Sequence, residues 1–271
     1  CLWRAYVRVF FDETTYHGPP YKTKCEMKVI CITQARMGSS RLPGKVLQLI
    51  HGKPMLEYHL LRVKQAKLID MHIVATTVHD IDKPIVEYCK NHQQAYFCGD
   101  EQDVLGRFYF AALDVGAQPD DIIVRLTGDC PLISGELIDD AISLHKQGVK
   151  GQYTHVSLDF FPRGFDCEVF TMAMLEDAYH NGMTQAQREH VTLYLYTQSA
   201  TVVVPLTTGD PLWRQFRFCV DELNDMRLVE EVLRQLGSNW LLASPNDICQ
   251  LLLQDEQLAN INKEVQQRTA H

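Results

Sequence analysis

Hydrophobic and polar positions follow two different periods along the chain, and these periods predict the order of its elements. Short, nearly continuous apolar runs are typical of strands that are covered on both faces. They occur at 29–32, 72–76, 95–97, 122–126, 153–156, 167–170, 201–206 and 216–220. Apolar residues at three- and four-residue spacing predict helices over 55–66, 80–91, 103–115, 135–147, 172–180, 185–196, 224–236 and 245–253.

The alternation of strands and helices predicts an α/β fold. A helix that crosses over between two strands returns the chain to start the next strand in parallel. We therefore expect a mostly parallel sheet flanked by helices on both faces. Ligands of such sheets bind beyond the carboxyl ends of the strands, so polar residues that follow a strand are the first candidates for a site.

Several helix ends carry capping signals. Asp80 or Asp82 is expected to cap the helix over 80–91, and Asp103 can cap the helix over 103–115. Gly148 and Gly237 follow the helices over 135–147 and 224–236 and are expected to end them.

The two ends of the chain lack this alternation. Residues 1–26 include the turn-rich segment His17-Gly-Pro-Pro-Tyr and are expected to lie outside the catalytic fold; an edge strand or oligomer contact over 5–11 is the alternative. Residues 254–271 are polar, without a strong pattern. The catalytic domain is therefore predicted to span 27–253.

Composition narrows the classes of function. The chain has 271 residues, 46% of them hydrophobic, and a formal net charge of -8, which disfavours a broad nucleic-acid surface. It has no apolar run of about 18 residues or more, so no membrane partner is expected. The 9 cysteines are scattered and form no C-x-x-C pair. A structural zinc site is therefore disfavoured, and buried, reduced thiols in a cytoplasmic protein are expected.

One polar stretch has the composition of an anion-binding loop. Gln34 to Val46 reads Q-A-R-M-G-S-S-R-L-P-G-K-V and follows the apolar run at 29–32. Its glycines let backbone amides turn inward, and its basic side chains add full charge around them. The stretch suits a polyphosphate. A solvated basic loop that only ends a strand is the alternative.

The loop matches neither of the two common nucleotide-binding motifs. A Walker A loop has four residues between its glycines and Ser or Thr after the lysine, whereas here 39–43 separate the glycines and Val46 follows Lys45. The chain also has no G-x-G-x-x-G, so a dinucleotide fingerprint is absent.

Two aspartates follow predicted strands and could supply carboxylates to a metal. Asp129 stands in Thr-Gly-Asp-Cys-Pro after the run at 122–126, and Asp221 stands in Cys-Val-Asp-Glu after the run at 216–220. Two carboxylates together with phosphate oxygens suit magnesium. Both could instead be helix caps or turn formers. The spacing alone leaves these two interpretations open.

These motifs together resemble the sugar-nucleotide cytidylyltransferases, the group that includes CMP-Kdo synthetase and the spore-coat polysaccharide protein SpsF. The resemblance runs from Met27 to about Gly237 through the loop, T-G-D-C-P-L-I, R-G-F-D-C-E-V-F and V-D-E-L-N-D. CMP-Kdo synthetases carry Gln before their Gly-Asp and Glu after it. Here Thr127 and Cys130 stand at those places, so the SpsF branch is the more similar and the sugar stays open.

The resemblance implies a Rossmann-like sheet of the nucleotide-diphospho-sugar transferase type in a single main domain. It also implies that Asp129 and Asp221 hold a catalytic Mg²⁺, and that CTP is the nucleotide. The expected catalytic set is Arg36, Arg41, Lys45, Asp129 and Asp221. The expected nucleotide-binding set is Gln34, Ala35, Arg36, Gly38, Ser39, Arg41, Lys45, Arg107 and Asp129.

An acceptor sugar is expected to bind between the runs at 153–156 and 167–170. Arg163, Asp166 and Glu168 could bind its hydroxyls, and Arg163 could bind a carboxylate or phosphate. Arg188 and His190 could close over the same pocket. Surface charges and a satisfied core histidine are the alternatives for these two residues. Similar R-G-x-D-x-E-V-F and R-E-H-V segments in SpsF-like chains support both.

The sequence thus predicts an enzyme that transfers CMP from CTP to a sugar and releases pyrophosphate. A homodimer is expected from the resemblance. One alternative is a glycosyltransferase that uses a nucleotide-sugar donor, for which Asp80-Ile-Asp82 is formally a D-x-D motif. Another is a non-catalytic nucleotide-binding protein.

Overall fold

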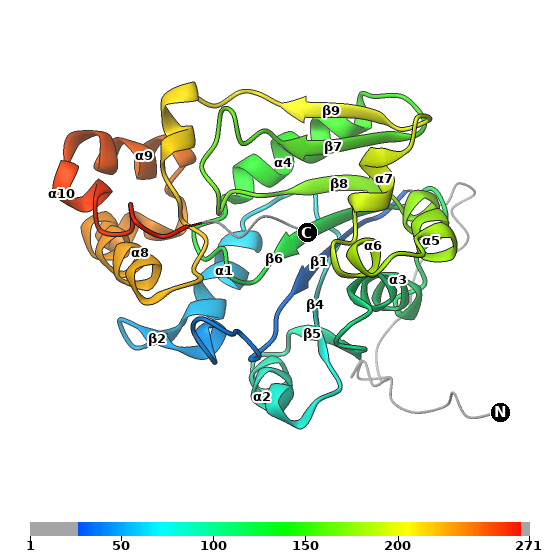
Figure 1. The fold of residues 1–271 in the computed structure, drawn as a ribbon, viewed down its shortest axis with the longest axis horizontal. Helices are drawn as coiled ribbons and strands as arrows, with labels where there is room; N and C mark the ends of the chain where they lie inside the picture. Colours follow the sequence, from blue (N-terminus) through cyan, green and yellow to red (C-terminus); the bar gives the residue numbers. More distant parts are fainter. Residues whose placement is uncertain (1–26, 267–271) are drawn as a thin grey trace, which may run out of the picture.

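A computed structural model describes residues 27–266 of the chain (Figure 1). The predicted N-terminal extension, its alternative as an edge strand, and the last residues of the C-terminal tail lie outside this range. Strands and helices alternate along the described part, as the hydrophobic pattern predicts.

A mixed, mostly parallel sheet forms the centre of the molecule. Its strand order is β5-β4-β1-β6-β8-β7-β9 (Figure 1). Only β8 runs antiparallel to its neighbours, β6 and β7. The strands are β1 (Val29–Gln34), β4 (Met71–Thr77), β5 (Ala95–Gly99), β6 (Ile122–Thr127), β7 (Gln152–Val156), β8 (Glu168–Thr171) and β9 (Val202–Leu206). A small hairpin pairs β2 (Leu49–Ile50) with β3 (Lys53–Pro54).

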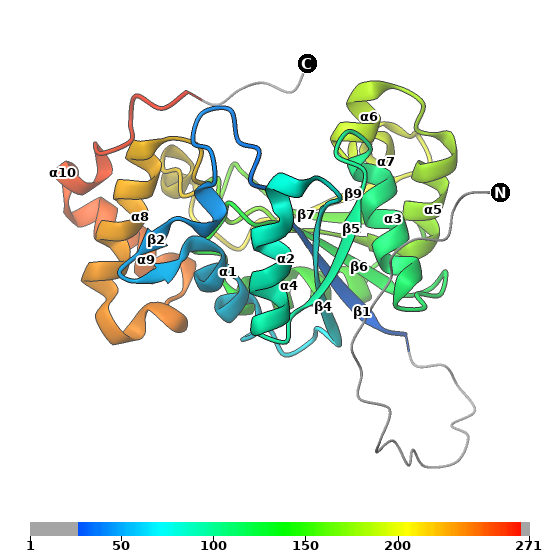
Figure 2. The same ribbon diagram turned by 90° about the horizontal axis from the view of Figure 1, so that it is seen from below.

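Helices cover both faces of this sheet (Figure 2). The α-helices are α1 (Met55–Val63), α2 (Lys83–Asn91), α3 (Val104–Asp114), α4 (Gly135–Lys146), α5 (Met172–Asn181), α6 (Gln185–Glu189), α7 (Leu193–Thr197), α8 (Leu223–Leu236), α9 (Pro245–Gln254) and α10 (Glu256–Ala259). Short 3-10 helices are η1 (Lys45–Leu47), η2 (Asp80–Asp82), η3 (Pro211–Gln215) and η4 (Gly237–Leu241).

The central strands supply side chains to two hydrophobic cores, one on each face. In β1, Val29 and Cys31 join the core beneath α1, α4 and α8, while Ile30 and Ile32 join the core beneath α3 and α5. This division follows from the period of two along a strand. It explains why the runs are apolar throughout rather than alternating, and it confirms the predicted α/β fold.

The predicted strand over 216–220 is wrong. Its residues pair with no strand of the described sheet apart from an isolated bridge between Arg217 and Arg163. Its amides bind single carbonyls instead: Phe218 N–H donates to Arg163 O at 2.7 Å and Val220 N–H donates to Asp129 O at 2.8 Å. The apolar residues Phe216, Phe218 and Val220 are buried as a strand pattern predicts, but they belong to an extended loop and not to a strand.

The single helix predicted over 185–196 is also wrong, because the segment forms two short helices, α6 and α7, with a non-helical link between them. Val191 has a positive φ of 22° and is completely buried. Thr192 beside it donates its hydroxyl to Glu168 at 2.8 Å. A continuous helix would allow neither the burial of Val191 nor the hydrogen bond from Thr192 to Glu168. Tertiary packing therefore overrides the local helical pattern.

Capping was predicted correctly at Asp103 and Gly237, wrongly at Asp80, and correctly in position but without a capping bond at Asp82. Asp103 accepts a hydrogen bond from Gly106 N–H at 2.8 Å, and Gly237 ends α8 with φ 53°. Asp80 is exposed and pairs with Lys83. Asp82 stands at the N-cap position of α2, but its carboxylate makes no capping bond, because it accepts a hydrogen bond from Met37 in the loop at residues 34–46.

The polar C-terminal segment begins as part of the packed fold. Asp255 accepts hydrogen bonds from Gln257 and Leu258 and so starts α10, whose Leu258 is buried. Asn262 is buried further along. This segment therefore packs onto the molecule beyond residue 253, where the sequence predicts the domain to end.

Two histidines near the centre of the sheet predict acid sensitivity. Burial lowers the pKa of His59 to about 4 and that of His72 to about 3, so both are neutral in the folded protein. In the unfolded chain they titrate near 6.5. Between these values the unfolded state binds more protons, so the free energy of unfolding falls as the pH drops from about 6.5 towards 4.

We expect each imidazole to cost about 2 kcal/mol of stability at pH 5 relative to pH 7. Urea unfolding at the two pH values measures this loss. In His72→Asn, the difference in the free energy of unfolding between pH 7 and pH 5 is expected to be about 2 kcal/mol smaller than in wild type. The control His92→Asn, at an exposed position, is expected to show the wild-type difference. An unchanged pH dependence in His72→Asn would contradict the prediction.

Candidate active site

The signature loop, residues 34–46, leaves the carboxyl end of β1 in the middle of the sheet. Gln34 O accepts Gly128 N–H at 2.8 Å, which ties the start of the loop to the turn after β6. Gly44 ends the loop with φ 70°, a conformation that favours glycine. Lys45 then enters η1 and is directed back under the loop. The loop therefore projects beyond the strand ends (Figure 2).

Asp82 anchors this loop from η2, directly before α2. Its Oδ1 accepts Met37 N–H at 2.6 Å and its Oδ2 accepts the hydroxyl of Thr77. The side chain is only 2% exposed, so both bonds are shielded from water. Sequence reasoning missed this role because an aspartate before a helix reads first as a cap.

We expect Asp82→Ala to loosen the signature loop. A hydrogen bond to a charged group contributes about 1.5–3 kcal/mol, so the loop should open about tenfold or more often. Limited trypsin digestion after Arg36 and Arg41 measures this opening. Asp80→Ala, two residues away and exposed, is the matched control. Equal cleavage rates in the two variants would contradict the anchoring role.

Lys45 joins the two predicted metal-binding aspartates. Its Nζ lies 3.0 Å from Asp129 Oδ2, 2.9 Å from Asp221 Oδ1 and 2.6 Å from the carbonyl oxygen of Val220. The loop, the turn after β6 and the segment before α8 therefore meet at one point. The three motifs singled out in the sequence are thus brought together, although Asp221 does not follow a strand of the sheet.

Two arginines complete this ionic centre. Arg41 lies 2.9 Å from Asp221 and 3.0 Å from Glu222, and Arg217 contacts Asp221 as well. Arg217 also lies 3.1 Å from Asp225, which is fully buried. The centre thus alternates cations and carboxylates. Replacing one member leaves a poorly solvated charge on its neighbours.

The ionic contacts shift two pKa values in opposite directions. Burial alone would lower the pKa of Lys45, but the charges of Asp129 and Asp221 outweigh it and raise that pKa. Burial would raise the pKa of Asp221, but Lys45 and Arg217 outweigh it and lower that pKa. Lys45 is therefore an ammonium and Asp221 a carboxylate over the whole physiological range.

The chemistry of the Lys45 contacts fits a divalent cation. Two carboxylate oxygens and a carbonyl oxygen already surround the cationic Nζ, and Mg²⁺ prefers oxygen ligands of this kind. No group of three or more His, Cys, Asp or Glu side chains that could hold a metal occurs within residues 27–266. Further ligands would therefore be phosphate and water oxygens, which is typical of Mg²⁺.

The other predicted nucleotide-binding side chains lie on the β5 side of the signature loop. Arg36 is half exposed and lies 3.2 Å from Glu101. Arg107 is buried, donates to Asp100 O at 2.9 Å, and has its pKa lowered to about 10 by burial and by Arg36. Ser39 accepts Leu42 N–H within the loop.

Two of the predicted acceptor-binding carboxylates are occupied by internal partners. Glu168 accepts Thr192 at 2.8 Å and also binds Arg125 and Tyr153. Burial would raise its pKa, but Arg125 and the hydroxyls outweigh it and lower that pKa. Asp166 accepts Gly164 N–H at 2.7 Å, and burial raises its pKa. Asp166 therefore shapes the loop between β7 and β8, whereas Glu168 links β8 to β6, β7 and the segment between α6 and α7.

The remaining predicted acceptor residues separate into two regions. Arg163 is exposed and lines a cavity of about 490 Å³ together with Arg214 and Arg217. Arg188 instead packs over Tyr179 and lies 3.4 Å from Asp103, at the start of α3. His190 ends α6. The cavity adjoins the ionic centre because Arg217 belongs to both.

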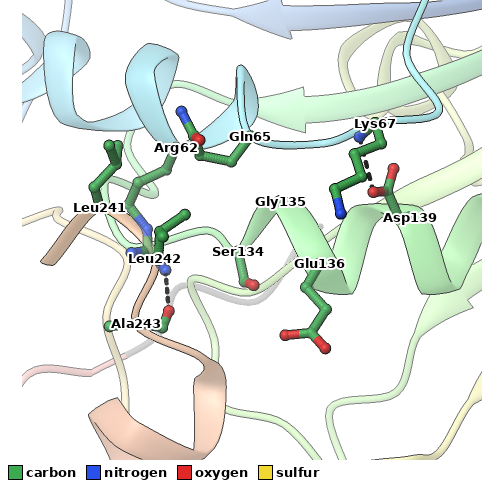
Figure 3. Close-up of a pocket in the computed structure, with 10 residues that line it drawn as sticks. All are labelled: Arg62, Gln65, Lys67, Ser134, Gly135, Glu136, Asp139, Leu241, Leu242 and Ala243. Atoms are coloured by element: carbon green, nitrogen blue, oxygen red, sulfur yellow. Dashed lines mark hydrogen bonds between the residues drawn. The ribbon is translucent and has the colours of Figure 1, made fainter. Parts of the chain in front are cut away.

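A second cavity, of about 300 Å³, lies between α1, the start of α4 and η4 (Figure 3). Arg62 lines it, and its guanidinium donates to the carbonyls of Ile133, Trp240 and Ala243. A side chain at Gly135 would meet Ala66 N at 2.7 Å. Arg62 therefore joins three segments of backbone, and this cavity shares no residue with the ionic centre.

Several members of the ionic centre were not predicted. Arg217, Glu222, Asp225 and Asn262 form its base: Asn262 donates to Arg217 O at 3.0 Å and to Asp225 at 2.8 Å. The only sequence signal was the V-D-E-L-N-D segment, which contains Glu222 and Asp225. Arg217 and Asn262 lie in segments whose packing no local pattern reveals.

Comparison with known proteins agrees with this geometry. The cytidylyltransferase family matches residues 30–259. The chain belongs to this family. As a cytidylyltransferase it is a nucleotidyltransferase, which confirms the enzyme class and the family predicted from the loop, Asp129 and Asp221 motifs.

Two curated relatives resemble this cytidylyltransferase over most of their length. It is 38% identical to the uncharacterized protein MJ1063 of Methanocaldococcus jannaschii, over 90% of this chain and 98% of that protein. It is 31% identical to the spore coat polysaccharide biosynthesis protein SpsF of Bacillus subtilis, over 77% of this chain and 88% of that protein.

Solved structures support the fold of the cytidylyltransferase. A cytidylyltransferase from Leptospira borgpetersenii superposes with a TM-score of 0.79 at 28% identity, covering 90% of this chain and all of that one. A CMP-2-keto-3-deoxy-manno-octonic acid synthetase in complex with CTP superposes with a TM-score of 0.56 at 17% identity, covering 78% of this chain and all of that one. Across residues 27–266, no helix is long and apolar enough to cross a membrane.

Proposed function

We propose that this cytidylyltransferase transfers CMP from CTP to a sugar, with release of pyrophosphate, in the synthesis of a surface polysaccharide or another glycan. One observation carries the proposal: Lys45 of the signature loop contacts both Asp129, in the turn after β6, and Asp221, in the segment before α8. This places a phosphate-binding loop directly beside two carboxylates. A nucleoside triphosphate bound by the loop would present its α-phosphate to them.

The chain's own residues would act mainly by position and charge. Arg36, Arg41 and Lys45 bind the triphosphate and offset the charge that grows on the departing pyrophosphate. Amides of the loop orient the phosphates. Triphosphate oxygens replace the carboxylates as partners of Arg41 when the nucleotide binds. The acceptor hydroxyl attacks the α-phosphorus in line with the leaving group.

Asp129 and Asp221 would hold Mg²⁺, which lowers the pKa of the attacking hydroxyl and neutralises phosphate charge. Their oxygens already converge on a cation, the Lys45 ammonium. Asp221 keeps its charge at neutral pH because Lys45 and Arg217 lower its pKa. We further propose that the enzyme is a cytoplasmic homodimer that needs neither nucleic acid nor membrane.

The cavity beside the ionic centre indicates the chemistry of the acceptor. Arg163 and Arg214 line it, and both are exposed in a chain whose net charge is -8. Arginine pairs favourably with carboxylates and phosphates. We therefore propose an acceptor with an acidic group, such as a sugar acid, that binds in this cavity next to Arg217.

Arg163→Gln and Arg214→Gln are each expected to raise the KM for the acceptor about tenfold or more, because each removes a charge-assisted hydrogen bond. The KM for CTP should change by less than about twofold. Steady-state kinetics with each substrate varied in turn measures both constants. Arg234→Gln, on the exposed face of α8, is the control. An unchanged acceptor KM in both variants, or use of neutral sugars by the wild type as efficient as that of sugar acids, would contradict an acidic acceptor.

The glycosyltransferase alternative loses its motif in this geometry. Asp80 pairs with Lys83, and Asp82 is buried against Met37 and Thr77, so this D-x-D offers no pair of free carboxylates.

The deciding experiment is pyrophosphate release with Mg²⁺, in which each of the four ribonucleoside triphosphates is tested against sugar acids, amino sugars and sugar phosphates. Release with CTP and one acceptor is expected. Release with another nucleotide would overturn the choice of CTP. No release in any pairing, or sugar transfer from an intact nucleotide-sugar, would overturn the proposal.

A further inference from the structure

A chain of hydrogen-bonded polar side chains runs from His72 on β4, through Thr33 on β1 and His59 on α1, to the turn that carries Asp129. The Thr33 hydroxyl lies 2.9 Å from His59 Nε2 and 2.8 Å from His72 Nε2. His59 Nδ1 lies 2.9 Å from the carbonyl oxygen of Cys130. Thr33 and His59 have no exposed surface, so the two bonds of His59 are shielded from water, whereas the bond to His72 is partly buried.

The direction of each bond follows from its last acceptor. The Cys130 carbonyl can only accept, so His59 Nδ1 carries the proton and the neutral ring accepts at Nε2. Thr33 therefore donates its hydroxyl to His59. His72 then donates its Nε2–H to Thr33. One arrangement of protons satisfies all three bonds, and such a network favours a single geometry.

The chain of bonds ties together the parts of the proposed active site. Thr33 immediately precedes Gln34, the first residue of the signature loop, and His59 lies on α1. Cys130 follows Asp129 directly. The other side of the same turn is held by Val220, which donates to Asp129 O. Two hydrogen bonds therefore hold the backbone at Asp129: one from Val220 N–H to Asp129 O, and one from His59 to the carbonyl oxygen of Cys130.

We propose that His59 is a positioning residue that fixes the Asp129 carboxylate relative to the loop through its hydrogen bond to Cys130 O. The inference rests on the proposed function, since it assigns Asp129 a metal and a nucleotide. Apolar side chains would fill this core at lower cost than two imidazoles and a hydroxyl. Outer partners of metal ligands commonly change metal affinity about 10–100-fold when they are replaced.

Two amide variants separate positioning from core packing. His59→Asn keeps an N–H near the Nδ1 position and can still donate to Cys130 O, but it loses the bond to Thr33. His59→Gln reaches the Nε2 position instead, so it can pair with Thr33 and loses the bond to Cys130 O. Both bury an amide of similar polarity, so both should lower thermal stability to a similar extent.

The first readout is the dissociation constant of Mn²⁺ in the presence of CTP, measured by titration calorimetry. We expect His59→Gln to weaken it about tenfold and to lower kcat about tenfold with little change in the KM for CTP. His59→Asn should stay within about threefold of wild type in each constant. Equal losses in the two variants, or no loss in either, would overturn the positioning role.

A second readout does not depend on turnover. ¹⁵N NMR of histidine-labelled wild-type protein is expected to show His59 as the neutral tautomer protonated at Nδ1, and assignment uses the His59→Asn spectrum. A ring protonated at Nε2 would overturn the inference. A wild-type enzyme that releases no pyrophosphate, yet shows the Nδ1 tautomer and the difference in Mn²⁺ affinity between the variants, would contradict the proposed reaction and leave the positioning role intact.

Discussion

Replacing Asp129 with asparagine is expected to lower the rate of pyrophosphate release by about a hundredfold or more. Asparagine keeps the shape of the side chain, so the turn after β6 and the Val220 bond to Asp129 O should survive. The negative charge next to Lys45 is lost. Losing a strong electrostatic stabiliser costs about 10²–10³ in rate. Initial rates with saturating CTP and acceptor measure the effect.

Asp80→Asn is the matched control for this prediction. It removes a carboxylate at an exposed position, and it also tests the D-x-D motif of the glycosyltransferase alternative. We expect it to leave the rate within about twofold of wild type, because surface substitutions are usually close to neutral. Near-full activity of Asp129→Asn would show that Asp129 is not a metal ligand.

Lys45→Met is expected to have two large effects of opposite sign. It removes a cation from the triphosphate site, so pyrophosphate release should fall about a hundredfold or more. It also empties the space between Asp129 and Asp221, where the ammonium lies 3.0 Å and 2.9 Å from the carboxylates. Without nucleotide, Mn²⁺ should therefore bind the variant about tenfold or more tightly than wild type.

Calorimetric titration of Mn²⁺ into the nucleotide-free protein tests the second effect. Lys53→Met is the control, because Lys53 is partly exposed and pairs with Glu57 at 2.9 Å rather than with a member of the ionic centre. Lys45→Met should also be less stable, since two carboxylates lose their shared cation, and Mn²⁺ should restore part of its melting temperature. Unchanged Mn²⁺ affinity would mean that Lys45 does not compete with a metal for these oxygens.

The architecture followed from the sequence because its signals are local. Apolar runs and helical spacing mark the strands of the parallel sheet, and parallel strands bring their carboxyl ends to one edge. Lys45 and Asp129 were therefore expected to lie close together, although 84 residues separate them. The family match and the fold confirm this part of the prediction.

The details that failed depend on contacts between distant segments. The run at 216–220 has the period of a strand, yet it is held by Arg163 and Asp129 rather than by a ladder. The helix over 185–196 breaks because Val191 enters the core and Thr192 reaches Glu168. A local pattern records burial, but it does not record which partner provides it.

Asp82 and Asn262 show the same limit within the active site. Each is a common polar residue with an ordinary local explanation, a helix cap for Asp82 and a polar tail for Asn262. Their roles depend on tertiary contacts, those of Asp82 in η2 with Met37 and of Asn262 in the C-terminal segment with Arg217.

The ionic centre also sets an order of events while the ribosome makes the chain. Lys45 is synthesised 84 residues before Asp129 and 176 residues before Asp221. Asn262, the partner of Asp225, is synthesised 37 residues after it. Contacts of such long separation form slowly. In the growing chain Lys45 can therefore meet Asp129 early, whereas Arg41 has neither of its carboxylate partners, Asp221 and Glu222, until the segment just before α8 has been made.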